Sequence, residues 1–143
     1  MQYKNRTRPI MIKQLKPLLE GLHKELPGFV TAAVVNCDDG LSLSELSVQP
    51  EIEAGTAAAY LSSIVKSNRK AIKLLANDAI TDDIIVSTGQ HHFIIRDLPN
   101  LPFFLFVMTD RNEWLGRTKM VMQSLEKELL AIMLEMYPAT VTS

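Results

Sequence analysis

Two nearly uninterrupted apolar runs, Phe29 to Val35 and Phe103 to Met108, constrain the fold of this chain more than any other feature. A strand with one face in water alternates apolar and polar residues, and neither run does so. We therefore predict two central strands that are covered on both faces. Helices on both sides of the sheet would supply this cover.

Three other segments carry apolar residues in steps of three and four, which is the spacing of an amphipathic helix. The first segment precedes Pro27, and the last begins at Leu115. Pro50 is predicted to start a long middle helix, with Glu51 and Glu53 in its first turn, where the helix dipole favours anions. The face of this helix that we expect to lie on the sheet consists of Ala54, Ala57, Leu61, Ile64, Val65, Ile72 and Leu75.

Shorter strand patterns complete the order of elements. Leu41 and Leu43 alternate with serines after the first apolar run, which predicts a half-solvated strand. Two further strands are predicted at residues 84–87 and 93–95. The predicted order is helix, two strands, helix, three strands, helix, with the long helix on one face of the sheet and the terminal helices on the other.

The residues Asp38-Asp39-Gly40 join the first two predicted strands and allow two interpretations. Haloacid-dehalogenase-type phosphatases carry Asp-x-Asp-Gly at the end of a strand, but that site needs a carboxylate two residues before Asp39, where this chain has Cys37. Asp-Gly between two strands is also a strong hairpin signal, because glycine accepts a positive φ. We therefore interpret these residues as a turn and not as a catalytic site.

The composition indicates one soluble domain with a core over about residues 10–136 and short flexible termini. A formal net charge of −1 gives no reason to expect nucleic acid or an anionic membrane as a partner. Cys37 is the single cysteine, so no intrachain disulfide can form and a cytoplasmic location is expected. The basic start, with Lys4, Arg6 and Arg8, is followed by an apolar run too short for a secretory signal or a membrane span.

Residue types that often carry chemistry are isolated in this sequence. His91 and His92 are neighbours on a predicted strand, so they would point to opposite faces and would not easily share a metal ion. Cys37 has no histidine nearby in sequence to activate a thiol, and Trp114 is expected to pack beside the start of the last helix. No nucleotide-binding glycine loop or Gly-x-Ser-x-Gly occurs. We therefore expect no catalytic residue, cofactor or metal.

The layout resembles the roadblock family, the dynein-light-chain and bacterial Ras-like-GTPase-regulator type of domain. The resemblance rests on the Gly28-Phe29 start of the first strand, the Asp-Asp-Gly hairpin, the alanine-rich middle helix and Leu115-Gly116 at the start of the last helix. It covers roughly residues 12–136. It implies an α+β, profilin-like fold with a five-stranded antiparallel sheet, which dimerises through the middle helix and the strand after it. The paired helices would form a platform for a small GTPase or another scaffold chain.

Mapped onto this chain, the resemblance predicts two sets of site residues. The dimer contact is expected on Gly55, Ala58, Ala59, Ser62 and Lys66 of the middle helix and on Ile84, Ile85 and Val86 of the next strand. The partner-binding platform is expected on Lys66, Arg69, Lys70 and Lys73. Asp82 and Asp83 precede the pairing strand and would repel their symmetry mates, which leaves the register of that edge open.

The resemblance favours a non-enzymatic, homodimeric scaffold that binds a Ras-like small GTPase and modulates its nucleotide cycle. Two alternatives stay open from the sequence: a structural subunit of a motor or membrane-recruitment complex, and a small-ligand sensor that uses the sheet and the middle helix as a pocket. Genomic adjacency to a small GTPase would separate the first two. Thermal stabilisation by a metabolite would favour the sensor.

Overall fold

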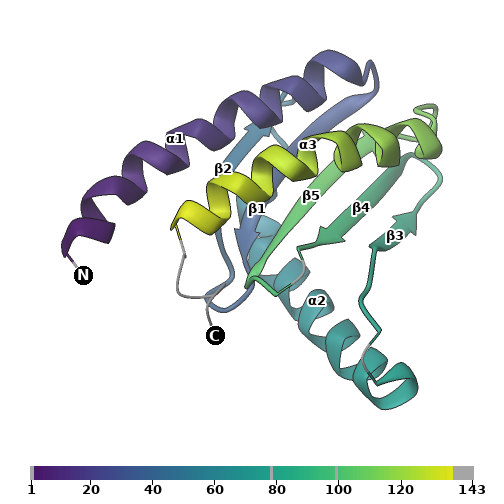
Figure 1. Ribbon diagram of the computed structural model, residues 1–143. Helices are drawn as coiled ribbons and strands as arrows, with labels where there is room; N and C mark the ends of the chain where they lie inside the picture. The colour runs from purple at the N-terminus through teal and green to yellow at the C-terminus, as the bar shows by residue number, and fades with distance from the viewer. Residues whose placement is uncertain (1, 78, 99, 137–143) are drawn as a thin grey trace.

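The computed structural model describes the backbone of residues 2–77, 79–98 and 100–136, and the side chains within residues 12–77, 79–98 and 100–135. Figure 1 shows the elements in chain order, which is the order that the sequence predicts. The first helix begins ahead of the first apolar position that marked it in the sequence. The elements are α1 (Gln2–Glu25), β1 (Phe29–Asn36), β2 (Leu41–Ser47), α2 (Ala54–Ala76), β3 (Asp83–Ser87), β4 (His91–Asp97), β5 (Phe103–Asp110) and α3 (Leu115–Met136).

The strands form one five-stranded antiparallel sheet in the order β2-β1-β5-β4-β3. β1 and β5, which contain the two apolar runs, are neighbours at its centre, with Ala33 opposite Phe106 and Val35 opposite Phe104. The helices α1 and α3 cover one face of the sheet, and α2 lies on the other (Figure 1). The predicted α+β fold class and layer arrangement are confirmed.

Each face of the sheet has its own hydrophobic core. The core under α1 and α3 includes Leu19, Phe103 and Met122, which are at most 1% exposed. Full burial of side chains of this size stabilises the fold by about 1.5–3 kcal/mol each. The core under α2 contains the small side chains of Ala33 and Ala58, so this helix can approach the sheet closely.

The Asp-Asp-Gly segment is a turn between β1 and β2, as predicted. Gly40 has a φ of 72°, which lies in the region that glycine accepts without strain. The backbone N–H of Asp38 donates to Oδ1 of Asn36 at 2.8 Å, and the N–H of Leu41 donates to Oδ1 of Asp39 at 2.9 Å. The carboxylate of Asp39 therefore accepts a hydrogen bond inside the turn, where it shapes the hairpin.

The predicted start of α2 is wrong, because the helix begins at Ala54 and not at Pro50. The backbone N–H of Ile52 donates to the carbonyl of Gln49 at 2.9 Å and closes a turn ahead of the helix. Ile52 packs against the core under α2, so the chain must reach the sheet before the helix can start. Both predicted first-turn glutamates consequently precede the helix.

The predicted sheet-facing side of α2 is partly right, since Ala54 and Val65 are buried, but the helix is rotated toward Ala58 and Ser62. Ala58 and Ser62 are buried at 0% and 3% exposure, whereas Ala57 and Ile64 are exposed. The burial of Ser62 is compensated because its hydroxyl donates to the carbonyl of Ala58 at 2.8 Å. The apolar pattern alone favoured the more hydrophobic side, but close packing on the β1–β2 hairpin favours the smaller one.

Candidate interaction surface

The small-residue flank of α2 packs against the protein's own hairpin. A Cβ placed on Gly40 would lie 3.1 Å from the Cα of Ala59, and a Cβ placed on Gly55 would lie 2.4 Å from Oε2 of Glu45. These two short distances show that the flank of Gly55 and Ala59 faces the β1–β2 hairpin. Of the predicted dimer residues on the helix, Ala59 and Lys66 are exposed, Gly55 is half-buried, and Ala58 and Ser62 lie in the core.

The other flank of α2 is an exposed stripe that the sequence reasoning placed partly in the core. Its residues recur in steps of three and four, the spacing of a helix that packs along a second helix. Tyr60 is 78% exposed, Ile64 43% and Leu74 87%. We call this set the α2 stripe: Ala57, Tyr60, Ile64, Ser67, Ala71 and Leu74.

The two edges of the sheet differ in how they are protected. At the β2 edge, Nζ of Lys16 donates to the carbonyl of Glu45, and the strand contacts both α1 and α2. A lysine and covering helices are common means of blocking an edge. At the β3 edge, Ile84 is half-buried, and Ile85 and Val86 are 38% and 49% exposed. The open edge is therefore β3, the strand that was predicted to pair.

One of the two carboxylates that precede the pairing strand is neutralised within the chain. Asp83 accepts from Nη1 of Arg96 at 3.1 Å and lies 3.5 Å from Nζ of Lys119. Burial disfavours the charged form of Arg96, but Glu126 and Asp83 outweigh it and raise the pKa of this guanidinium. Only Asp82 keeps an exposed carboxylate at this edge, so the expected repulsion between symmetry mates is reduced.

The predicted basic platform separates into one structural arginine and three exposed lysines. Arg69 donates through Nε to Asp97 at 2.8 Å and through Nη2 to the carbonyl of Leu101 at 3.2 Å. The hydrogen bond with Asp97 raises the pKa of Arg69. Lys66, Lys70 and Lys73 are exposed, and the ion pairs found among the described residues use none of them.

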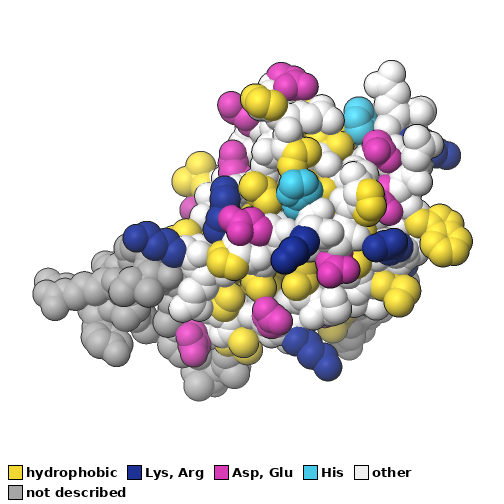
Figure 2. Space-filling view, turned by 90° about the horizontal axis from the view of Figure 1, so that it is seen from above, with side chains coloured by type: hydrophobic (Ala, Val, Ile, Leu, Met, Phe, Trp, Pro, Cys, Tyr) yellow, Lys and Arg dark blue, Asp and Glu magenta, His cyan; other side chains and the backbone are white. Residues whose placement is uncertain are grey.

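The face that is uppermost in Figure 1, which Figure 2 shows directly, carries charges of both signs. Lysines and arginines alternate there with acidic residues, and the described part of that face shows no large patch of one sign (Figure 2). The lysine flank of α2 differs, because Lys66, Lys70 and Lys73 follow one another on one side of the helix.

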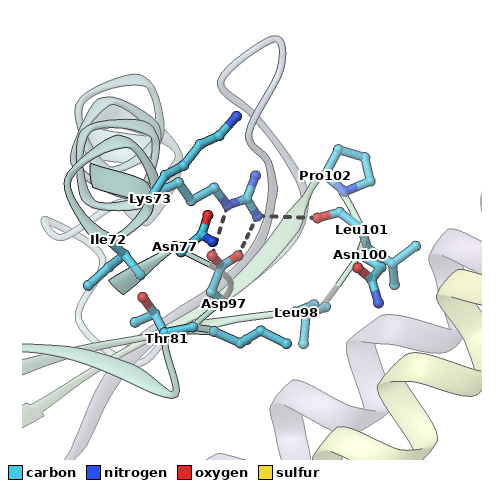
Figure 3. A pocket seen from close by; sticks show the side chains of 12 residues that line it. Ile72, Lys73, Asn77, Thr81, Asp97, Leu98, Asn100, Leu101 and Pro102 are labelled. Atoms are coloured by element: carbon cyan, nitrogen blue, oxygen red, sulfur yellow. Dashed lines mark hydrogen bonds and ion pairs between the residues drawn. The ribbon is translucent and has the colours of Figure 1, made fainter. Parts of the chain in front are cut away.

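A pocket of about 460 Å³ lies at the C-terminal end of α2 (Figure 3). The helix extends past the sheet at this end (Figure 1). Ile72 and Lys73 come from the helix, and Leu98 and Leu101 come from the segment after β4. Asp97, the last residue of β4, lies between these two walls (Figure 3). The sequence reasoning missed this pocket because its residues come from three separate segments. Its full lining is Arg69, Ile72, Lys73, Asn77, Ala79, Ile80, Thr81, Asp97, Leu98, Asn100, Leu101 and Pro102.

Cys37, His91 and His92 lie in surroundings that suit a role in packing. Cys37 is fully buried, and burial raises the pKa of its thiol. His92 is buried with Nδ1 2.7 Å from the hydroxyl of Ser87, while the ring of His91 contacts Phe93. Within the described residues, no group of three or more His, Cys, Asp or Glu is placed to hold a metal ion.

Trp114 does not pack beside the last helix, so that prediction is wrong. Its side chain is 80% exposed, and its backbone N–H donates to Oε2 of Glu113 at 3.2 Å. The other carboxylate oxygen of Glu113 accepts from the N–H of Gly28 at 2.8 Å. Glu113 thus closes the junction between α3 and the start of β1, which leaves the indole outside the core.

No protein-family model and no curated protein matches this sequence. Solved structures do match. MglB from Myxococcus xanthus superposes with a TM-score of 0.78 at 14% identity, over 87% of this chain and 91% of that chain. An MglB with a tetrameric arrangement gives 0.74 at 19% identity, over 84% and 88% of the two chains. A roadblock/LC7 domain from Streptomyces avermitilis gives 0.70 at 20% identity, over 82% and 95%.

This chain has the roadblock fold. The resemblance predicted from the sequence is thereby confirmed at the level of the fold. No helix within the described residues is long and apolar enough to cross a membrane.

Proposed function

We propose that this chain is a non-enzymatic, homodimeric scaffold that binds a Ras-like small GTPase and modulates its nucleotide cycle. The observation that carries the proposal is the α2 stripe, which lies exposed in a chain whose β3 edge is also open. Contiguous exposed apolar surface of this kind marks an interaction site in soluble proteins. The fold shared with MglB and roadblock/LC7 domains supports the same assignment.

The α2 stripe suits an antiparallel contact with its own copy. A twofold axis near Ser67 would place Tyr60 of one copy opposite Leu74 of the other, because both lie seven residues from the axis. The contact would continue through pairing of the two β3 edges at Ile85 and Val86. An interface of about 1,600 Å² is the usual size for such a specific contact.

The three lysines are the proposed contact for the GTPase. Lys66, Lys70 and Lys73 of two copies would contribute to one positive surface on the paired helices. Such a surface accelerates encounter with an acidic partner, and salt weakens the effect. Arg69 is proposed to act indirectly, because its guanidinium is held by Asp97 and Leu101.

The experiment begins by capturing partners from the native cell on the purified chain and identifying them by mass spectrometry. Hydrolysis and release of nucleotide by a captured GTPase are then measured with and without this protein. We expect one of the two rates to change, and we expect the double substitution Lys70→Glu/Lys73→Glu to slow association at low salt while the dimer persists. A partner that binds with both rates unchanged would favour the alternative of a structural subunit.

The small-ligand sensor remains the second candidate because the pocket at the end of α2 is large enough for a metabolite. A thermal-shift screen of the purified chain against a metabolite panel tests it. A rise in melting temperature that the substitution Ala79→Trp abolishes would favour the sensor over the scaffold.

A further inference from the structure

Two unusual backbone positions meet at the pocket below the end of α2. Among the described residues, the non-glycine residues with positive φ are Asn77, at 56°, and Asn100, at 61°. Both line this pocket, although they come from different loops. A positive φ is uncommon for a residue other than glycine, although Asn accepts it more readily than most, and it tends to persist where function or packing requires it.

Hydrogen bonds hold the walls of the pocket in place. Nδ2 of Asn68 donates to Oγ1 of Thr81 at 2.7 Å and ties the segment before β3 to the helix. Arg69 joins the helix to Asp97 and to the carbonyl of Leu101 on the opposite wall (Figure 3). The pocket is therefore formed before any ligand arrives, which lowers the entropic cost of binding.

The lining of the pocket combines apolar side chains with an internal ion pair, and the pocket has a positive charge at its rim. Ile72, Leu98 and Leu101 supply apolar walls, and Ile80 is 65% exposed at the opening. The charges of Arg69 and Asp97 offset each other in an ion pair. Lys73 is the charged residue without an ion pair among the described lining residues. It extends outward from the helix (Figure 3).

The positive rim extends beyond the pocket along the helix. From Lys66 to Lys73 the helix rises by about 10 Å, at roughly 1.5 Å per residue. That length corresponds to about three residues of an extended chain. An occupant that fills the pocket and also reaches these lysines must be a chain segment, since a compact small molecule would use the pocket alone.

We propose that this pocket receives one bulky apolar side chain of an acidic, extended protein segment, whose neighbouring carboxylates pair with Lys66, Lys70 and Lys73. The proposal adds a specific anchor to the proposed scaffold function and rests on it only in taking a protein as partner. Lys73 and the α2 stripe lie on different sides of the helix. A second copy packed on the stripe would therefore not cover Lys73.

The test uses the full chain and synthetic probes, without any GTPase. Probe one is the acetylated, amidated peptide Glu-Asp-Leu-Glu-Asp, probe two has Ser in place of Leu, and probe three is 4-methylpentanoate, which carries the apolar group and a single carboxylate. Binding is followed by amide chemical shifts in two-dimensional NMR. We expect probe one to move the signals of Ile80, Leu98 and Leu101, and probe two to bind at least about fivefold more weakly.

Two variants sharpen the result. Ala79→Trp fills the opening of the pocket and should weaken probe one by about tenfold or more. The matched control is Ala131→Trp on α3, which also replaces an exposed alanine and should leave binding unchanged. Unfolding midpoints of both variants check that each is folded. A further variant, Lys73→Glu, should lower affinity at low salt by about fivefold and by less at high salt.

Several outcomes would overturn the inference. Equal binding of the Leu and Ser peptides would show that charge alone is recognised and that the pocket is not used. Binding of 4-methylpentanoate as tight as that of probe one would assign the pocket to a small molecule. Absence of shifts at the pocket with probe one would remove the site. None of these results bears on dimerisation or on GTPase binding, which can fail independently.

Discussion

The two flanks of α2 differ in what they contact. One flank carries Gly55 and Ala59 and is packed on the β1–β2 hairpin, where an added Cβ would collide. The other carries Tyr60 and Ile64 and is open to solvent. On the first flank, α2 therefore lies close to the hairpin of its own chain. The exposed apolar residues of the second flank form the surface on which we propose that a second copy binds.

The two edges of the sheet repeat the same contrast. Lys16 donates to a carbonyl of β2, so this edge is occupied by the protein itself. The β3 edge exposes Ile85 and Val86. An ion pair between Asp83 of β3 and Arg96 of β4 holds this strand to the sheet. The open flank and the open edge both follow from what the rest of the chain leaves uncovered. Four predictions, three of them with a matched second variant, test this comparison.

The largest effect is expected when the same charged residue is placed either on the buried face of α2 or on its exposed face. Ala58→Asp should lower the free energy of unfolding by about 3 kcal/mol or more, because it buries an unpaired carboxylate in the core under α2. Ala57→Asp, at the adjacent exposed position, should change monomer stability by less than about 0.5 kcal/mol. Urea unfolding at several protein concentrations measures both. Similar losses in the two variants would mean that the helix is not rotated as described.

The next effect concerns the closed flank. Gly40→Ala should cost about 2 kcal/mol, because the residue has a φ of 72° and its new Cβ would lie 3.1 Å from the Cα of Ala59. Gly89→Ala is the control, since a Cβ there meets nothing within 4 Å, and it should stay within about 0.5 kcal/mol of the natural chain. Thermal or urea unfolding compares them. If Gly40→Ala were neutral, the close approach of α2 to the hairpin would be disproved.

A smaller effect is expected on the dissociation constant of the proposed dimer, and it distinguishes the two flanks of α2. Ile64→Arg should raise the dissociation constant of the proposed dimer by at least about tenfold, which corresponds to about 1.4 kcal/mol. Ala59→Arg introduces the same side chain on the closed flank and should have less effect on association. Sedimentation equilibrium measures the dissociation constants, and a natural chain that is monomeric at micromolar concentration would contradict the dimer itself. A stronger effect of Ala59→Arg would return the contact to the small-residue flank.

The smallest effect is expected at the turn. Asp39→Asn keeps the Oδ1 oxygen that accepts the N–H of Leu41, so stability and partner binding should change by less than about 0.5 kcal/mol. Unfolding and binding assays check this. A phosphatase activity of the purified protein that disappears in Asp39→Asn would show instead that the carboxylate is catalytic.

The sequence determined the layers of this protein. Continuous apolar runs at β1 and β5 required cover on two faces, and the helical spacing around them supplied it, because burial of apolar surface dominates the choice of architecture. Asp39 and Gly40 likewise determined a turn through local hydrogen bonding and positive φ. These features depend on neighbours along the chain, so they can be read from the chain alone.

Tertiary structure alone decided which side of α2 is buried and where the pocket lies. Ala58 is buried and Ile64 exposed because the close approach of the β1–β2 hairpin to α2 outweighs the difference in hydrophobicity between the two sides. Arg69 was predicted as a partner contact, yet Asp97, far along the chain, engages it. Such choices depend on distances between segments that are remote in sequence, and only the packed molecule sets those distances.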